Sequence, residues 1–304
     1  MDEISKKEEL EHFDSIKFLN YLLNYIANSS IHEMTLQQGT FSFFVLKKRA
    51  FNYAYNLPYG LYSGNLSSIE IDAAMKAFSA LNYSQLIFNV GPDVFIDKNE
   101  ALKISSELGF DLTSYACHII DTSKPIQDIF EGFNTTRKKH IKRYQKAGVL
   151  KVFRTKDPIY FKEYFKLYES SAKRWGSDTT YSAGLIEGLY QIPGIYMWVA
   201  EYNGEMLSGM ICFYHKNTVF DWLAASIINE DVKKLYPAVA VQYEVIRHAA
   251  ENGYTSVNMG ASNNLNGVSD FKDSWGAIEK KTYTFIKRKG IFALIKKIRN
   301  KLKN

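Results

Sequence analysis

Apolar positions along the first part of the chain alternate between helical spacing and short strand-like runs. The helical period predicts three helices, at 15–27, 69–83 and 97–108. Apolar runs predict three strands, at 41–48, 86–90 and 115–121. Gly109 follows the third helix, as expected of a residue that terminates helices. This alternation indicates the α/β class.

The next segment predicts helix, strand and helix in close succession. A basic helix at 133–147 ends before Gly148, a strand follows at 149–153, and a helix at 158–173 begins with proline in its first turn. No short repeat and no low-complexity segment interrupts the pattern.

An antiparallel meander of three strands follows. Its first two strands, at 195–202 and 205–215, are separated by Asn203 and Gly204, a dipeptide typical of tight hairpin turns. The third strand is predicted at 218–226. After a polar loop come a helix at 237–252 and two strands, at 256–260 and 281–288.

Composition limits the possible classes of protein. The chain has 304 residues and 46% apolar content, enough for one large domain or two of about 150 residues. No apolar run approaches the roughly 18 residues of a membrane span, and 1–10 is too charged for a signal peptide, so we expect a cytoplasmic protein.

The cysteines and histidines give no sign of a metal site. Cys117 and Cys212 both lie in apolar strand-like runs and are expected to be buried free thiols, not a disulfide or a zinc site. The histidines show no metal-ligand spacing. We therefore expect no metal.

Three segments in the second half resemble one protein family. The basic helix TRKKHIKRYQKAGV, the segment LYPAVAVQYEVIRHAAENGYTSVNMGAS and the ending GVSDFKDSWGA resemble the FemAB-like branch of the GNAT acyltransferase superfamily. The order of predicted elements is also that of a GNAT-type fold. The resemblance covers roughly 130–290. This branch includes peptidoglycan-bridge aminoacyltransferases and acyltransferases of polysaccharide gene clusters.

The resemblance implies two GNAT-like domains with a substrate cleft between them. We expect a degenerate domain at 1–124 and an acyltransferase domain at 125–290, the latter with a mixed, mainly antiparallel sheet flanked by helices. A basic amphipathic tail, 291–304, completes the chain. Its apolar and basic residues suit either an anionic membrane surface on the inner face of the membrane or packing against the protein body.

The implied reaction is transfer of an acyl or aminoacyl group to an amine of a cell-envelope or polysaccharide precursor. Such a reaction needs an unprotonated amine, a donor held nearby and stabilisation of the developing oxyanion, but no covalent nucleophile. The donor would be acyl-CoA or aminoacyl-tRNA. The glycine-rich Q/R-x-x-G-x-G/A pattern of coenzyme A users is missing, so both donors stay open.

Candidate donor-binding residues lie in the loop before the helix at 237–252 and at the end of the following strand. Backbone N–H groups at that helix N-terminus, assisted by nearby lysines, can bind an anion, although Pro237 removes one N–H group. The candidates are Lys233, Lys234, Ala238, Val239, Asn258, Gly260, Ser262, Asn263 and Phe271. A plain solvated loop is the alternative interpretation.

Two residues are candidates for catalysis. The resemblance places Lys272 near the reacting carbonyl, where an ammonium group can stabilise an oxyanion. Asp221, in the third meander strand, can accept the proton of the amine, with Glu244 and Glu201 as competitors. Strand alternation predicts that Asp221 and Trp222 point to opposite faces of the sheet.

Candidate acceptor-binding residues are arginines that suit phosphate, and an aromatic ring that can stack on a sugar. They are Arg137, Arg143, Arg174 and Trp175. The net charge, 38 − 32 = +6, is concentrated in 137–151 and 287–303. This basic character suits a phosphate-bearing sugar or peptide precursor, or tRNA; DNA is not expected as a partner. A solvated helix face is the alternative.

Two further functions fit the same sequence. A non-catalytic GNAT-like module would bind tRNA, a nucleotide sugar or a membrane without turnover. An ordinary coenzyme A-dependent acetyltransferase would modify a protein or a small amine.

Overall fold

The computed structural model describes residues 13–36, 39–48, 51–57, 68–91, 96–174, 181–262, 266–290 and 293. The chain divides into two compact units. Unit 1 comprises Met1–Phe13 and His118–Glu279, and unit 2 comprises Asp14–Cys117 and Lys280–Asn304. The predicted tail at 291–304 lies outside the described residues except for Ala293.

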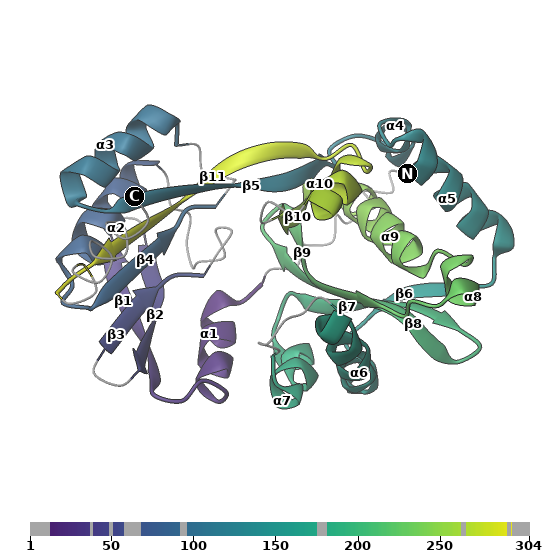
Figure 1. Cartoon of the computed structure of the whole chain (residues 1–304), viewed down its shortest axis with the longest axis horizontal. Coiled ribbons are helices and arrows are strands. Elements are labelled where there is room, and N and C mark those ends of the chain that lie inside the picture. Colours follow the sequence, from purple (N-terminus) through teal and green to yellow (C-terminus); the bar gives the residue numbers. More distant parts are fainter. Residues whose placement is uncertain are drawn as a thin grey trace, which may run out of the picture. The chain divides into compact units, whose positions relative to one another are not determined.

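Unit 2 contains a mixed sheet in the order β1-β2-β3-β4-β11-β5 (Figure 1). Its elements are α1 (Ser15–Leu23), β1 (Ser29–Leu36), β2 (Gly39–Lys48), β3 (Phe51–Tyr55), α2 (Ser68–Ala80), β4 (Gln85–Asn89), α3 (Lys98–Leu108), most of β5 (Asp111–Asp121) and most of β11 (Ile278–Arg288). Apolar residues of α2 and α3 pack with alternate residues of the strands in a single core cluster.

Unit 1 contains the order β5-β10-β9-β8-β7-β6, in which β7, β8 and β9 form the predicted antiparallel meander. Its elements are α4 (Ile126–Glu131), α5 (Thr135–Ala147), β6 (Lys151–Thr155), α6 (Pro158–Arg174), α7 (Ala183–Glu187), the 3₁₀ helix η2 (Leu189–Gln191), β7 (Ile195–Tyr202), β8 (Glu205–His215), β9 (Thr218–Ser226), α8 (Glu230–Lys233), α9 (Pro237–Glu251), β10 (Ser256–Ala261) and α10 (Asn266–Asp273).

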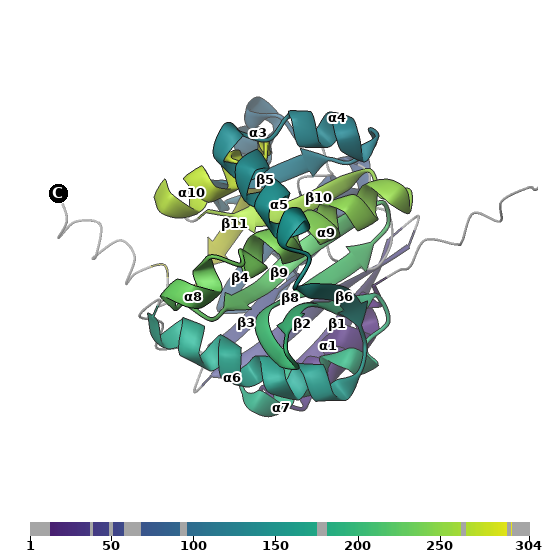
Figure 2. The same ribbon diagram turned by 90° about the vertical axis from the view of Figure 1, so that its right-hand side faces the viewer.

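Helices cover both faces of the unit 1 sheet. Helices α5 and α9 lie on one face and α6 and α7 on the other, as both views show (Figures 1 and 2). The α9 face forms a core cluster that includes Val241, Val245 and Ile246. The predicted α/β class, with a mixed and mainly antiparallel sheet flanked by helices, is confirmed.

Local sequence signals explain where several elements end. The Asn134 side chain accepts a hydrogen bond from the N–H of Arg137 and caps α5, and Gly148 ends that helix with φ +62°. Asn203 and Gly204 also have positive φ, 51° and 80°, as a two-residue hairpin turn between paired strands requires. The stop at Gly148 and the turn at Asn203 and Gly204 are the ones that the sequence predicts, whereas the Asn134 cap starts α5 at Thr135, two residues later than predicted.

The structure divides the chain differently from the predicted boundaries. The predicted second domain, 125–290, includes the last strand, whereas residues from Lys280 onward belong to unit 2. The reason is pairing: β11 runs antiparallel to β4 from Thr284 opposite Asn89 to Arg288 opposite Gln85. Alternate residues Tyr283 and Phe285 then enter the unit 2 core.

Candidate active site

A β-bulge in β9 places two successive side chains at one site. Ile211 of β8 pairs with Leu223, and the next residue, Cys212, pairs with Asp221, so Trp222 is an extra residue in β9. Asp221 and Trp222 both line the same cavity. Their contacts support the prediction that they point to opposite faces of the sheet: Asp221 contacts Gln242 of α9 and Cys212, whereas the Trp222 ring lies 4.9 Å from that of Phe213 and 5.2 Å from that of Tyr181.

The cavity begins where two parallel strands stop pairing. The pairs between β10 and β9 run from Ser256 opposite Thr218 to Asn258 opposite Phe220. The next residues, Asp221 on β9 and Met259 on β10, line the cavity. An end of strand pairing inside a sheet leaves room for a ligand between the two strands.

The cavity has a volume of about 720 Å³ and is lined mainly by apolar side chains. Its wall is formed by α6, β8, β9, β10, the N-terminal part of α9, and α10. The lining residues are Ser171, Arg174, Met210, Asp221, Trp222, Ala224, Ala225, Ser226, Ile228, Ala238, Gln242, Met259, Gly267, Val268, Phe271 and Lys272. An apolar cavity with a few converging polar groups is typical of small-molecule sites.

Asp221 is the acidic residue of this wall. Its Oδ2 accepts a hydrogen bond of 2.8 Å from Nε2 of Gln242, and Oδ1 lies 3.7 Å from Sγ of Cys212. Burial raises the pKa of Asp221 to about 6, although the Gln242 hydrogen bond and the charge of Lys272 lower it. The carboxyl group can therefore take up and release a proton near neutral pH.

This pKa predicts that Asp221 lowers the stability of the protein as the pH rises from about 4 to about 7. The pKa is about 6 in the folded state against an ordinary value of 3.8, so the folded state binds the proton more tightly and the free energy of unfolding falls across this range. A pKa difference corresponds to about 1.4 kcal/mol per unit, and partial solvent access reduces this value. The free energy of unfolding should therefore fall by about 1–3 kcal/mol over this pH range.

This effect is measured by urea unfolding of the wild-type protein and of Asp221→Asn at pH values of about 4 and about 7. The variant should gain stability relative to the wild type at the higher pH. A difference that does not change with pH contradicts the raised pKa.

Lys272 lies in the last turn of helix α10. Its side chain is only 7% exposed, and Nζ donates hydrogen bonds of 2.9 Å to the carbonyl oxygens of Gly260 and Ala261. Gly260 has φ +70°, and its N–H donates to Oδ1 of Asn258 at 2.8 Å. The end of β10 thus fixes the ammonium group at the cavity wall.

Arg137 of α5 contacts α10 and the residues that follow it, and it does not line the cavity. It is buried, and Nε and Nη2 donate to Oγ of Ser274 at 3.1 and 2.8 Å. The guanidinium also lies 4.7 Å from the ring centre of Phe271 and 4.6 Å from that of Trp275. Burial lowers the pKa of Arg137 to about 10, so it stays charged at neutral pH.

Ser262 takes part in a group of polar contacts that connects the end of β10 with α10. Its Oγ lies 3.2 Å from Nδ1 of the fully buried His118, whose Nε2 lies 3.3 Å from Oγ of Ser269. The carboxylates of Asp273 and Glu279 each approach the same Nε2 at 3.5 Å. His118 therefore connects β5 with the end of β10 and with α10.

The remaining candidates are dispersed. Lys233 and Lys234 are exposed and pair with Glu230 and Asp231 within the short helix α8, and neither lines the cavity. Arg143 donates to the hydroxyl of Tyr236 at 2.8 Å. Val239 is buried in the core, whereas its neighbour Ala238 lines the cavity. Trp175 and Asn263 lie outside the described residues.

Gln242 is a site residue that the sequence did not reveal. It lies in α9, is 2% exposed and directs its amide to Asp221. The available signal was a glutamine on a helix face of otherwise apolar residues, because a buried amide needs a polar partner. The competing carboxylates do not line the cavity: Glu244 pairs with Arg247, and Glu201 lies 3.3 Å from the hydroxyl of Tyr160.

Two features of the wall suit an anionic donor. Ala238 is the second residue of α9, so the positive N-terminus of this helix lies at the cavity. Lys272 adds an amino group whose positive charge lowers the pKa of Asp221. Across the described ranges, no group of three or more His, Cys, Asp or Glu side chains is arranged to hold a metal ion.

Residues 133–273 match the family model of the acetyltransferase (GNAT) domain. Solved structures also share the fold: FemX has a TM-score of 0.66 at 14% identity, covering 90% of this chain and 96% of its own. The C-terminal domain of a putative lysylphosphatidylglycerol synthetase from Agrobacterium fabrum has a TM-score of 0.61 at 10% identity, covering 94% and 96%.

L-PGS from Bacillus licheniformis has a TM-score of 0.58 at 14% identity, covering 96% of this chain and 97% of its own. Comparison with curated proteins gives no match. Residues 133–273 therefore match a GNAT acetyltransferase domain, as the resemblance predicted, and the chain shares the fold of FemX. None of the helices in the described part of the chain is both long and apolar enough to cross a membrane.

Proposed function

We propose that this chain, through its GNAT domain at 133–273, transfers an acyl or aminoacyl group to an amine of a cell-envelope or polysaccharide precursor. The observation that carries the proposal is the cavity in that domain, whose mainly apolar wall includes both Asp221 and Lys272. The similarity in fold to FemX and to L-PGS supports this choice of acceptor.

In the proposed reaction, the amine nitrogen attacks the carbonyl carbon of the donor. Asp221 takes the proton that the amine loses, and its raised pKa suits this exchange near neutral pH. A C–N bond forms while the C–S bond of a thioester or the C–O bond of an ester breaks, and the leaving group takes a proton.

Lys272 stabilises the charge that develops on the carbonyl oxygen. Its position is fixed by two backbone carbonyl groups, so the ammonium group needs little reorganisation during the reaction. The N-terminus of α9 provides the anion contact for phosphate groups of the donor.

A mass-spectrometric screen of the purified full-length chain tests the proposal. Acyl-CoAs and aminoacyl-tRNAs are offered in combination with amino-sugar nucleotides and peptide precursors, and the acceptor is expected to gain the mass of one acyl or aminoacyl group. Asp221→Asn serves as the matched protein control. No mass gain on any acceptor, with ligand binding intact, would overturn the transferase in favour of a non-catalytic binding module.

A further inference from the structure

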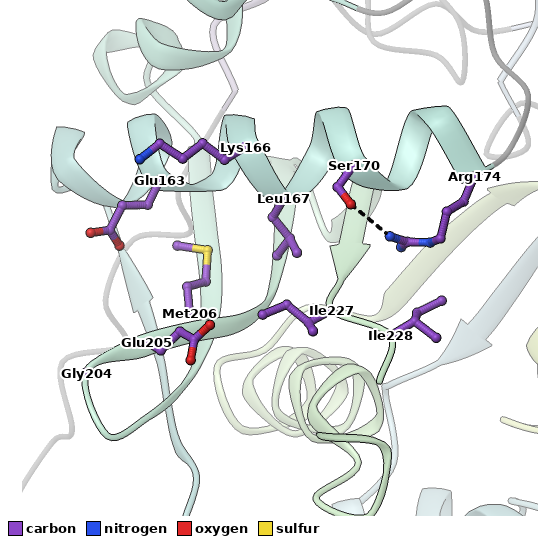
Figure 3. A pocket seen from close by; sticks show the side chains of 10 residues that line it. All are labelled: Glu163, Lys166, Leu167, Ser170, Arg174, Gly204, Glu205, Met206, Ile227 and Ile228. Carbon is purple, nitrogen blue, oxygen red and sulfur yellow. Dashed lines mark hydrogen bonds between the residues drawn. The ribbon is translucent and has the colours of Figure 1, made fainter. Parts of the chain in front are cut away.

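A second cavity of about 580 Å³ lies beside the proposed reaction cavity in unit 1, and we call it the side groove (Figure 3). Three segments form it: helix α6, the β7–β8 turn with the start of β8, and the residues that follow β9. The lining residues are Glu163, Lys166, Leu167, Ser170, Arg174, Gly204, Glu205, Met206, Ile227 and Ile228.

The side groove and the reaction cavity share part of their walls. Arg174 and Ile228 line both. Ile228 is 58% exposed, so its apolar surface is open to a ligand at the border of the two cavities. A ligand in the reaction cavity can therefore extend past these two residues into the side groove.

Arg174 is held in place at this border by neutral oxygen atoms. Nη1 donates to Oγ of Ser170 at 3.2 Å, and Nη2 donates to Oγ of Ser171 at 2.7 Å and to the carbonyl oxygen of Ser226 at 2.9 Å. Within the described ranges, no carboxylate pairs with this guanidinium. An arginine oriented in this way keeps its full charge for an oxyanion.

Beyond Arg174, the side groove is amphipathic. Leu167 and Met206 are nearly buried and, with Ile227, give it an apolar surface. Three charged residues also line the side groove: Glu163 and Lys166 of α6, and Glu205 at the start of β8 (Figure 3). Such a surface suits a hydrocarbon chain and not a second highly charged group.

We propose that the side groove binds the aliphatic part of a substrate whose oxyanion contacts Arg174 and whose reacting end lies in the reaction cavity. The class of ligand is a phosphate or carboxylate carried on an aliphatic chain. This inference rests on the proposed function for the position of the reacting end, but binding in the side groove is measured without turnover.

Isothermal titration calorimetry of the full-length protein tests this assignment with inorganic phosphate, hexyl phosphate and hexanoate. At least one of the two hexyl probes should bind about tenfold or more tightly than inorganic phosphate, because burial of several methylene groups favours binding. The stronger of the two identifies the oxyanion as phosphate or carboxylate. Equal affinity for all three probes, or binding of none, overturns the proposal.

Variants separate the contribution of the anion from that of the chain. Arg174→Gln should weaken the stronger hexyl probe by about tenfold or more, and Arg174→Lys, which keeps the charge and loses the fork, should weaken it less. Leu167→Gln should remove most of the difference in affinity between the stronger hexyl probe and inorganic phosphate. Lys103→Gln, at an exposed residue of α3 that lines neither cavity, should bind as the wild type does.

The exposed position Ile228 offers a matched pair that is expected to fold. Ile228→Asp places a negative charge beside Arg174 and should repel both hexyl probes, whereas Ile228→Asn, of nearly equal size, should lose only the apolar contact. Equal affinities of these two variants, or wild-type affinity in Arg174→Gln, contradict the assignment. Absence of turnover in the wild-type protein, with the hexyl probe still bound through Arg174, would overturn the proposed function alone.

Discussion

Replacing Asp221 with asparagine is expected to lower the rate of acyl transfer by about 10²–10⁴-fold, the range typical of a lost general base. Asparagine keeps the size of the side chain and can still meet Gln242, but it cannot accept the proton of the amine. The rate should be measured by single-turnover mass spectrometry with the donor and acceptor that the screen identifies.

The pH dependence of kcat/KM tests whether Asp221 is the proton acceptor. Because the pKa of Asp221 is about 6, kcat/KM of the wild type should fall as the pH drops below about 6, where the carboxylate becomes protonated. Asp221→Asn should lack this limb. Asp231→Asn, an exposed residue that pairs with Lys234, is the matched control and should keep both rate and profile. An Asp221→Asn variant with the wild-type profile would remove Asp221 from the chemistry.

Replacing Lys272 with methionine is expected to lower kcat by about 10²–10³-fold, as the loss of an oxyanion-stabilising group does. Methionine keeps most of the length of the side chain and removes the charge. The carbonyl groups of Gly260 and Ala261 also lose their donor in a buried position, which should cost about 1–3 kcal/mol of stability.

Stability and catalysis can be separated for this variant. The free energy of unfolding is measured by urea titration, and kcat is measured at a temperature where Lys272→Met is fully folded. Lys272→Arg, which keeps the charge, should retain more activity than Lys272→Met. Lys139→Met, on the exposed surface of α5, should change neither quantity. An unchanged kcat in folded Lys272→Met would contradict the proposed role.

Signals that act over a few neighbouring residues were readable from the sequence. The stop at Gly148 and the turn at Asn203 and Gly204 depend only on local backbone preferences, and the structure has them where the sequence predicts them. The placement of Asp221 and Lys272 followed from the order of elements and from the family resemblance. Both line the same cavity.

Features that depend on a distant partner were not readable. The bulge at Trp222 arises from the register of β9 against β8, and a single strand sequence does not contain that register. Gln242 becomes a site residue only because Asp221 faces it across the cavity wall. Arg137 was predicted to contact the acceptor. In the structure its guanidinium is buried against Phe271 and Trp275, which lie far along the chain, so the sequence around Arg137 does not reveal this contact.

The division of β11 between the units has a consequence for the order of folding during synthesis. Unit 2 needs β11 between β4 and β5, and its core includes Tyr283 and Phe285, yet these residues leave the ribosome after nearly all of unit 1. The facing edges of β4 and β5 therefore stay unpaired until β11 has been synthesised. The GNAT domain can complete its own meander earlier, so the strands of unit 2 depend on β11 to protect edges that are synthesised long before it.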